Sequence, residues 1–165
     1  RISIAELGLQ RLPLWTDILL TTIGFLVSPL VASIILALIT SWFPGFHADQ
    51  TQDIGFKALG SRTDNMLAFV TLVVLAPLAE ETLFRGYLYG KLKRYVPVIW
   101  AAVITSALFG LAHFQLNVGI DVFVLSLVLC ALRSVTGSIW AGVLVHMAKN
   151  AIAYYILFIR PMIGG

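Results

Sequence analysis

Two carboxylates and a guanidinium stand within one short stretch of the chain, directly after an apolar run at residues 66–78. If that run spans a bilayer, Glu80, Glu81 and Arg85 lie at a depth where ionisable groups cost about 2.5–3.5 kcal/mol each and mark functional sites. On a helix, Glu81 and Arg85 are four residues apart and can form an ion pair on one face. Glu80 points about 100° away from Glu81, so the spacing predicts a paired Glu81 and a Glu80 available for chemistry. The alternative is a helix end at the membrane interface with all three side chains solvated.

Two histidines and an asparagine fall in the apolar stretches that follow. His146 and Asn150 are four residues apart within residues 139–159, so their side chains can point to the same place. His113 ends an earlier apolar stretch, where a single histidine is also compatible with a structural role. A carboxylate and an imidazole that share one water molecule form a general base, and an imidazole with an amide supplies donors for an oxyanion. The set predicts hydrolysis of an amide bond with water as the nucleophile.

The elements that must position these side chains are membrane helices. The 165 residues are 59% hydrophobic and 12% charged, with a mean hydropathy of +0.95, whereas soluble domains are about 45–50% apolar. One span needs about 20 apolar residues. We therefore predict an all-α fold, a polytopic transmembrane helical bundle of about five spans with kinked or broken helices. The expected spans are residues 14–43, 66–89, 97–114, 118–133 and 139–159.

Two prolines and the N-terminal segment refine this prediction. Pro29 lies inside the first span and Pro77 just before Glu80, and each is expected to bend or break its helix because proline lacks the backbone N–H. Residues 1–13 are predicted to form a helix or turn on the membrane surface. We expect two parts: residues 1–65, an N-terminal interfacial segment with the first span and a loop, and residues 66–160, the catalytic core.

The charges indicate an orientation and exclude one class of partner. A net charge of +3 among so few charged residues belongs to loops beside the membrane and does not predict a nucleic-acid surface. In alternating loops, six Lys and Arg residues lie on one side and three on the other, which favours a cytoplasmic N-terminus. The six are Arg1, Arg11, Lys91, Lys93, Arg94 and Arg133, and the three are Lys57, Arg62 and Arg160.

Three ordered motifs resemble the CAAX protease and bacteriocin-processing family, also called the ABI family, which includes the CAAX prenyl endopeptidase that processes Ras. They are Glu80-Glu81-x-x-x-Arg85, Phe109-x-x-x-His113 and His146-x-x-x-Asn150. The similarity covers about residues 66 to 160, and residues 136–140 are also similar to family sequence.

The resemblance implies an intramembrane endopeptidase of the glutamate type that needs no metal or other cofactor. It implies that Glu80 and His113 activate water, that His146 and Asn150 form the oxyanion site, and that Glu81 and Arg85 support them. The implied partners are the lipid bilayer and a peptide or protein substrate, either a prenylated C-a-a-X terminus or a bacteriocin or signalling peptide. The short loops and small size favour a multi-pass protein of a prokaryotic cell membrane.

Two alternatives stay open. The first is a zinc-dependent membrane protease in which Glu80, His113 and His146 bind the metal, although the chain has no His-Glu-x-x-His sequence. The second is a non-catalytic membrane immunity or scaffold protein of the same fold.

Overall fold

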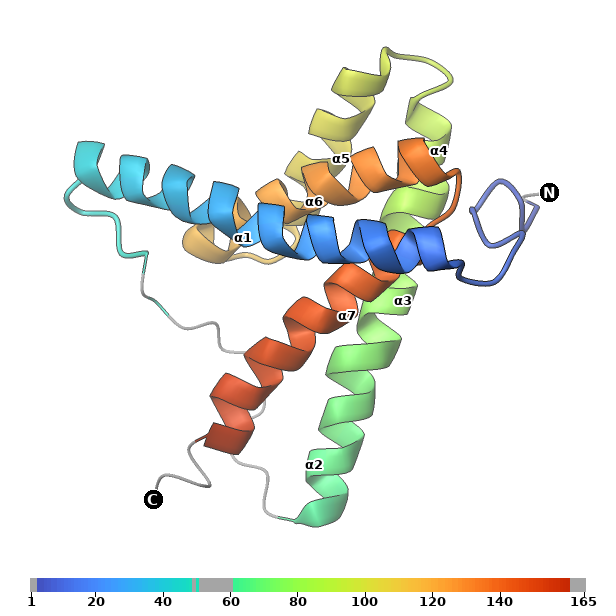
Figure 1. Ribbon diagram of the computed structural model, residues 1–165. Helices are drawn as coiled ribbons and strands as arrows, with labels where there is room; N and C mark the ends of the chain where they lie inside the picture. The colour runs from blue at the N-terminus through green and yellow to red at the C-terminus, as the bar shows by residue number, and fades with distance from the viewer. Residues whose placement is uncertain (1–2, 49, 51–60, 161–165) are drawn as a thin grey trace.

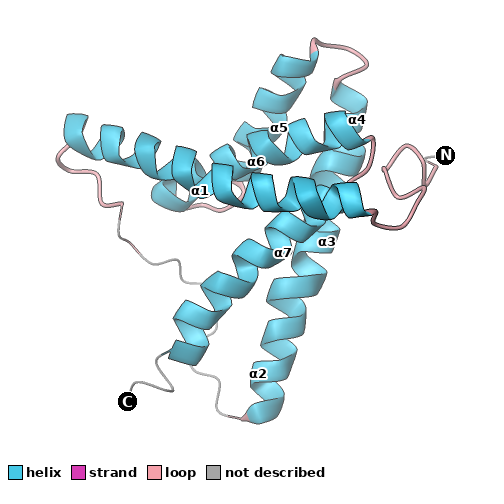
Figure 2. Cartoon of the chain, in the orientation of Figure 1, coloured by secondary structure: helices cyan, strands magenta, loops and turns pink. Residues whose placement is uncertain are grey.

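The computed structural model describes residues 3–48, 50 and 61–160, and the only regular elements among them are helices (Figures 1 and 2). One long helix between α1 and α5 consists of five consecutive segments, three of them α-helical and two of them π-helical. The elements in chain order are α1 Trp15–Trp42, α2 Arg62–Phe69, η1 Val70–Leu75, α3 Ala76–Glu81, η2 Thr82–Leu88, α4 Tyr89–Leu92, α5 Val98–Leu111, α6 Leu116–Thr136, α7 Trp140–Tyr154 and η3 Tyr155–Ile159. The predicted all-α fold is confirmed.

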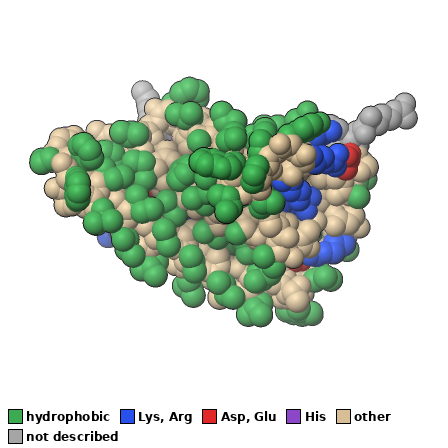
Figure 3. Space-filling view, turned by 90° about the horizontal axis from the view of Figure 1, so that it is seen from above, with side chains coloured by type: hydrophobic (Ala, Val, Ile, Leu, Met, Phe, Trp, Pro, Cys, Tyr) green, Lys and Arg blue, Asp and Glu red, His purple; other side chains and the backbone are tan. Residues whose placement is uncertain are grey.

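Within the described part of the chain, four helices are long and apolar enough to cross a membrane. They are Trp15–Trp42, Arg62–Leu92, Leu116–Thr136 and Trp140–Ile159. The remaining apolar helix, α5, has 14 residues and is therefore about 21 Å long, which is less than the ~30 Å hydrocarbon core. The predicted multi-pass bundle is thus built from four long helices and a short one. Hydrophobic side chains are spread across the whole width of the face seen in Figure 3, and charged side chains are few there.

The first helix is continuous. α1 runs through Pro29 without interruption, so the break expected at Pro29 does not occur. Its buried face carries small residues, Gly24, Ser28 and Ala32, which allow helices to approach closely. A Cβ added at Gly24 would lie 3.1 Å from Leu132 Cδ1 on α6 and 3.2 Å from a Val145 methyl on α7. Pro29 itself is exposed, and the buried small residues lie on both sides of it along the helix.

The long helix departs from α geometry on both sides of the glutamate pair. The N–H of Ala76 donates to Thr71 O at the end of η1, and the N–H of Tyr89 donates to Phe84 O at the end of η2, five residues back in each case. Each π turn accommodates one extra residue and so turns the side chains that follow by about 100°. The irregularity predicted near Pro77 is present as this change of helix type, with Pro77 at the start of α3.

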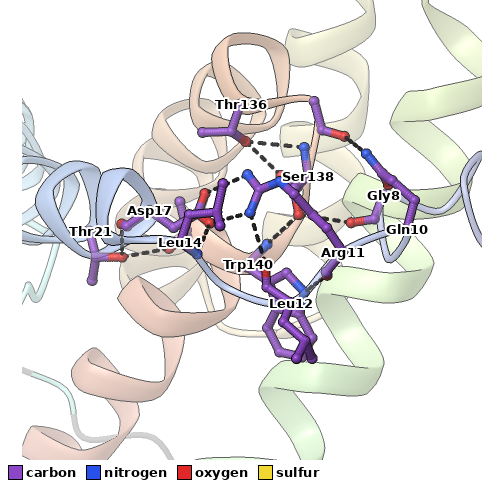
Figure 4. A network of polar contacts seen from close by, with 12 residues as sticks. Gly8, Gln10, Arg11, Leu12, Leu14, Asp17, Thr21, Thr136, Ser138 and Trp140 are labelled. Carbon is purple, nitrogen blue, oxygen red and sulfur yellow. Dashed lines mark hydrogen bonds and ion pairs between the residues drawn. The ribbon is translucent and has the colours of Figure 1, made fainter.

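The N-terminal turn, residues 3–13, is a series of turns packed on the connection between α6 and α7 (Figure 4). Gly8 O accepts hydrogen bonds from the N–H of Ile139 at 3.2 Å and from the Ser138 hydroxyl at 2.9 Å. The indole N–H of Trp140 donates to Arg11 O at 2.6 Å. Of the helix or turn predicted here, the structure therefore has the turn. Its contacts join the start of α1 to the start of α7.

Candidate active site

Glu81 connects the long helix to α7. Its Oε1 accepts a hydrogen bond from Arg85 Nη1 at 2.8 Å and lies 3.0 Å from His146 Nδ1. The side chains of Glu81 and Arg85 are both 0% exposed, so the predicted ion pair is present and fully buried. Because an ionised carboxylate only accepts, Nδ1 of His146 carries the hydrogen in this contact. The pair with Glu81 therefore fixes the orientation of the His146 ring.

Gly142 makes room for the Glu81 carboxylate, and sequence reasoning missed it. A Cβ at Gly142 would lie 3.1 Å from Glu81 Oε2, closer than ordinary van der Waals contact. Gly142 precedes His146 by one turn on α7 and so shares its face. The spacing Gly142-x-x-x-His146 was the available signal, because a missing side chain next to a site residue leaves space for a partner.

Glu80 lies in a different environment from its neighbour. Its Oε2 is 3.7 Å from His146 Nε2, and its side chain is 36% exposed. That distance exceeds a normal hydrogen bond, so the carboxylate faces the imidazole without being locked to it. The two adjacent glutamates therefore differ as the helical spacing predicted: one is paired and buried, the other partly exposed.

Phe109 organises the charged and imidazole side chains around its ring. The ring is buried, with Arg85 Cζ 4.4 Å from its centroid, a cation–π distance. The rings of His113 and His146 stand edge-on to it, with centroids 5.0 and 5.8 Å away. His113 Nδ1 is 2.8 Å from Phe109 O. A carbonyl only accepts, so Nδ1 donates there, and Nε2 is the nitrogen on which a neutral His113 ring can take a proton.

One cavity of about 730 Å³ is lined by side chains from the long helix, α5, α6 and α7. Glu80, His113, His146 and Asn150 all line it, while Glu81 and Arg85 do not. The structure thus brings the four predicted catalytic residues to the wall of one cavity and leaves the two predicted supporting residues behind it. Most other lining side chains are apolar, among them Phe84, Phe109 and Leu125.

Two polar features of the cavity wall differ from what the sequence suggested. The amide Nδ2 of Asn150 donates to Leu72 O on the long helix at 2.9 Å, so one of its two N–H groups is engaged by protein. Lys149 on α7 and Asp121 on α6 form an ion pair that the spacing of the sequence did not predict. Both line the cavity, so the wall also carries a paired charge away from Glu80.

Metal ligands do not gather at this site. Over residues 3–48, 50 and 61–160, no three His, Cys, Asp or Glu side chains converge in a way that could hold a metal ion. Glu80 and His146 approach each other, and His113, in the turn after α5, bonds through Nδ1 to Phe109 O of that helix. Within the described residues, no such group includes Glu80, His113 and His146, the residues of the alternative zinc site.

A family match covers the part of the chain that carries the site. A sequence model of the family described as "Type II CAAX prenyl endopeptidase Rce1-like" matches residues 62–152, more than half of the chain. A protein of Escherichia coli described as "Uncharacterized 24.3 kDa protein" is 39% identical over 94 residues, which is 54% of this chain and 43% of that protein. The chain thus spans less than half the length of this relative. No solved structure matches significantly.

Proposed function

The chain belongs to the family of Rce1-like type II CAAX prenyl endopeptidases, and we propose that it is a membrane-embedded endopeptidase of the glutamate type. The observation that supports this most is the single cavity on which Glu80, His113, His146 and Asn150 meet. Carboxylate, imidazole and amide are the groups that water activation and oxyanion binding need.

In the proposed reaction, Glu80 takes a proton from a water molecule in the cavity, and the water oxygen attacks the carbonyl carbon of the scissile peptide bond. His113 orients the same water through Nε2. When the tetrahedral intermediate collapses, the C–N bond breaks and the proton held by Glu80 passes to the leaving amine. Glu80 suits this role because it faces the cavity and, unlike Glu81, has no arginine partner in the described chain.

His146 and Asn150 supply the oxyanion donors in this proposal. Because Nδ1 of His146 donates to Glu81, Nε2 can donate to an oxyanion only when the ring is protonated. The Glu81 carboxylate provides the countercharge for that form. Asn150 uses one amide N–H for Leu72 O and offers the second to the oxyanion. Glu81 and Arg85 act through His146 and hold its ring in place.

The proposed substrate class is supported by the family membership and by the groups that line the cavity. We assign to this protein a peptide or protein substrate reached at the bilayer, with residues 66–160 as the catalytic part. Prenylated C-a-a-X termini and bacteriocin or signalling peptides are the two candidate substrates, and a prokaryotic cell membrane is the proposed location.

The test is cleavage of internally quenched peptides by the purified full chain in lipid nanodiscs. One set carries a prenylated C-a-a-X terminus and a second set has the same sequences without the lipid. Each is assayed with and without a chelator. We expect cleavage that the chelator leaves unchanged. Inhibition by the chelator with recovery on added zinc would favour the zinc protease, and absence of cleavage of every peptide by folded protein would favour the non-catalytic alternative.

A further inference from the structure

The carbonyl oxygen of Leu72 lacks a partner within its own helix. At the end of η1, Ala76 donates to Thr71 O, so the next bond of the same type would run from residue 77 to Leu72. Residue 77 is proline, which has no N–H to donate. Ala76, the donor that α geometry would use, is already engaged with Thr71. The π turn followed by proline thus leaves one acceptor at membrane depth that must be satisfied from outside the helix.

Asn150 supplies the missing donor. Its Nδ2 lies 2.9 Å from Leu72 O and joins residues 78 positions apart in the chain. The same face of α7 makes two further attachments to the long helix, one turn away on either side. His146 contacts Glu81 at 3.0 Å, and the Tyr154 hydroxyl donates to Asn65 O at 2.8 Å. The Asn150 bond lies between these two attachments, and its acceptor, Leu72 O, is five residues before Pro77.

The register of the long helix decides where its glutamates point. If the π turn in η1 relaxed to α geometry, the side chains that follow would rotate by about 100°. Glu81 would then leave His146, and Glu80 would leave the cavity wall. Because Pro77 has no N–H, residue 77 cannot donate to Leu72 O within the π turn. The register of the long helix then depends on a donor from α7.

We propose that Asn150 is a positioning residue as well as an oxyanion donor: by satisfying the Leu72 carbonyl that Pro77 leaves unpaired, it holds the helix register that aims Glu80 and Glu81 at His146. The catalytic part of this inference rests on the proposed function, whereas the stabilising bond does not.

A double-mutant cycle between Asn150 and Pro77 tests the inference. Pro77→Ala restores a backbone N–H for Leu72 O and so replaces the bond that Asn150→Ala removes. We expect Asn150→Ala to lower both Tm and kcat when residue 77 is proline. When residue 77 is alanine, the loss of Tm should largely disappear and the loss of kcat should shrink by about tenfold, the effect of roughly 1.4 kcal/mol. The loss of kcat that remains in the double variant measures the contribution of Asn150 as an oxyanion donor.

Pro29→Ala is the matched control, because Pro29 also lies inside a helix but far in sequence from Asn150. Its effect on Tm and kcat should be the same in the wild-type chain and in the Asn150→Ala variant. If Asn150→Ala does not fold, recovery of folded yield by Pro77→Ala and not by Pro29→Ala supports the proposal, and no recovery overturns it. Additive effects of Pro77→Ala and Asn150→Ala on Tm and kcat would also overturn it. The wild-type protein could also prove inactive while the effects of Pro77→Ala and Asn150→Ala on Tm are strongly coupled. That result would support the bond between Asn150 and Leu72 O and reject the proposed function.

Discussion

At the residue scale, two identical side chains acquire different chemistry from their surroundings. Glu81 is buried and accepts from Arg85 and His146, whereas Glu80 is 36% exposed and faces the cavity. Removing one partner of a buried ion pair leaves an uncompensated charge, which is far more costly than removing both. The pair behind the cavity is therefore a condition for folding as well as a support for the site.

Replacing Arg85 should reduce folded protein before it reduces catalysis. Arg85→Ala leaves Glu81 as an unpaired buried carboxylate, and breaking such a pair costs about 3–5 kcal/mol. We expect a strong loss of thermal stability, measured on protein in nanodiscs. The double variant Arg85→Met/Glu81→Gln should recover part of it because neither charge remains. Unchanged stability of Arg85→Ala would mean that the pair does not contribute to the folded state.

Adding one methyl group behind Glu81 should impair the site more than it impairs stability. Gly142→Ala places a Cβ 3.1 Å from Glu81 Oε2, so the carboxylate must shift, and His146 with it. Crowding costs about 1–3 kcal/mol, which the ~1 kcal/mol higher helix propensity of alanine partly offsets. We expect kcat to fall at least tenfold, since each 1.36 kcal/mol is about tenfold in rate.

Gly24→Ala is the control for that experiment. Gly24 has the same closest approach, 3.1 Å to Leu132, and a second at 3.2 Å to Val145, but it does not line the cavity. It should lose stability and keep kcat. An equal loss of kcat in both variants would show that general packing, and not the position of Glu81, sets the rate.

At the element scale, the sequence predicted the helices better than their internal geometry. Apolar length located the spans, and the four-residue spacings located Glu81 with Arg85 and His146 with Asn150. Helical spacing alone could not give the π segments, because an inserted turn depends on contacts such as Asn150 with Leu72 O, which join distant parts of the chain. The unbroken course of α1 through Pro29 was likewise not predicted, and α1 packs closely against α6 and α7 at Gly24.

The attachment of the N-terminal turn should depend on pH through Glu6. The pKa of Glu6 lies below its usual value because the carboxylate accepts from the Ser3 N–H and, next in importance, from Arg94. A lowered folded-state pKa means that this stabilisation is complete above the unfolded value of about 4.3. It is lost as the pH falls through the folded value.

Hydrogen–deuterium exchange of residues 3–13, corrected for the intrinsic effect of pH, measures this attachment. We expect faster exchange as the pH falls below about 4 and no such change in Glu6→Gln. The same pH dependence in Glu6→Gln would assign the effect to another group.

At the scale of the whole molecule, two of the basic residues assigned to one side by the alternating loops meet at Glu6. Arg94 pairs with Glu6 at 2.8 Å, and Arg133 donates to Glu6 O at 3.2 Å. Figure 3 shows Lys and Arg side chains gathered towards one end of a largely hydrophobic face. The N-terminal turn, the connection after α4 and the end of α6 therefore share one end of the bundle, which an orientation by positive charge requires.

The orientation of the chain across the membrane can be measured by labelling cysteines introduced one at a time. Cys130 is buried and should not react with a membrane-impermeant maleimide. Tyr95→Cys, at an exposed position beside Arg94, should react from the cytoplasmic side, and Arg62→Cys, at the other end of the long helix, from the opposite side. The reverse pattern would contradict the predicted cytoplasmic N-terminus.

The central claim is that Glu80 activates water while Glu81 holds the site together, and the most direct measurement compares Glu80→Gln with Glu81→Gln. Peptide cleavage and thermal stability are measured on both variants in the same nanodiscs. Glutamine keeps the shape of Glu80 but cannot take the proton, so we expect a rate loss of at least about 10²-fold with nearly unchanged stability. Glu81→Gln should lose stability, since Arg85 is then a buried cation without a partner. Full activity of Glu80→Gln would contradict the account.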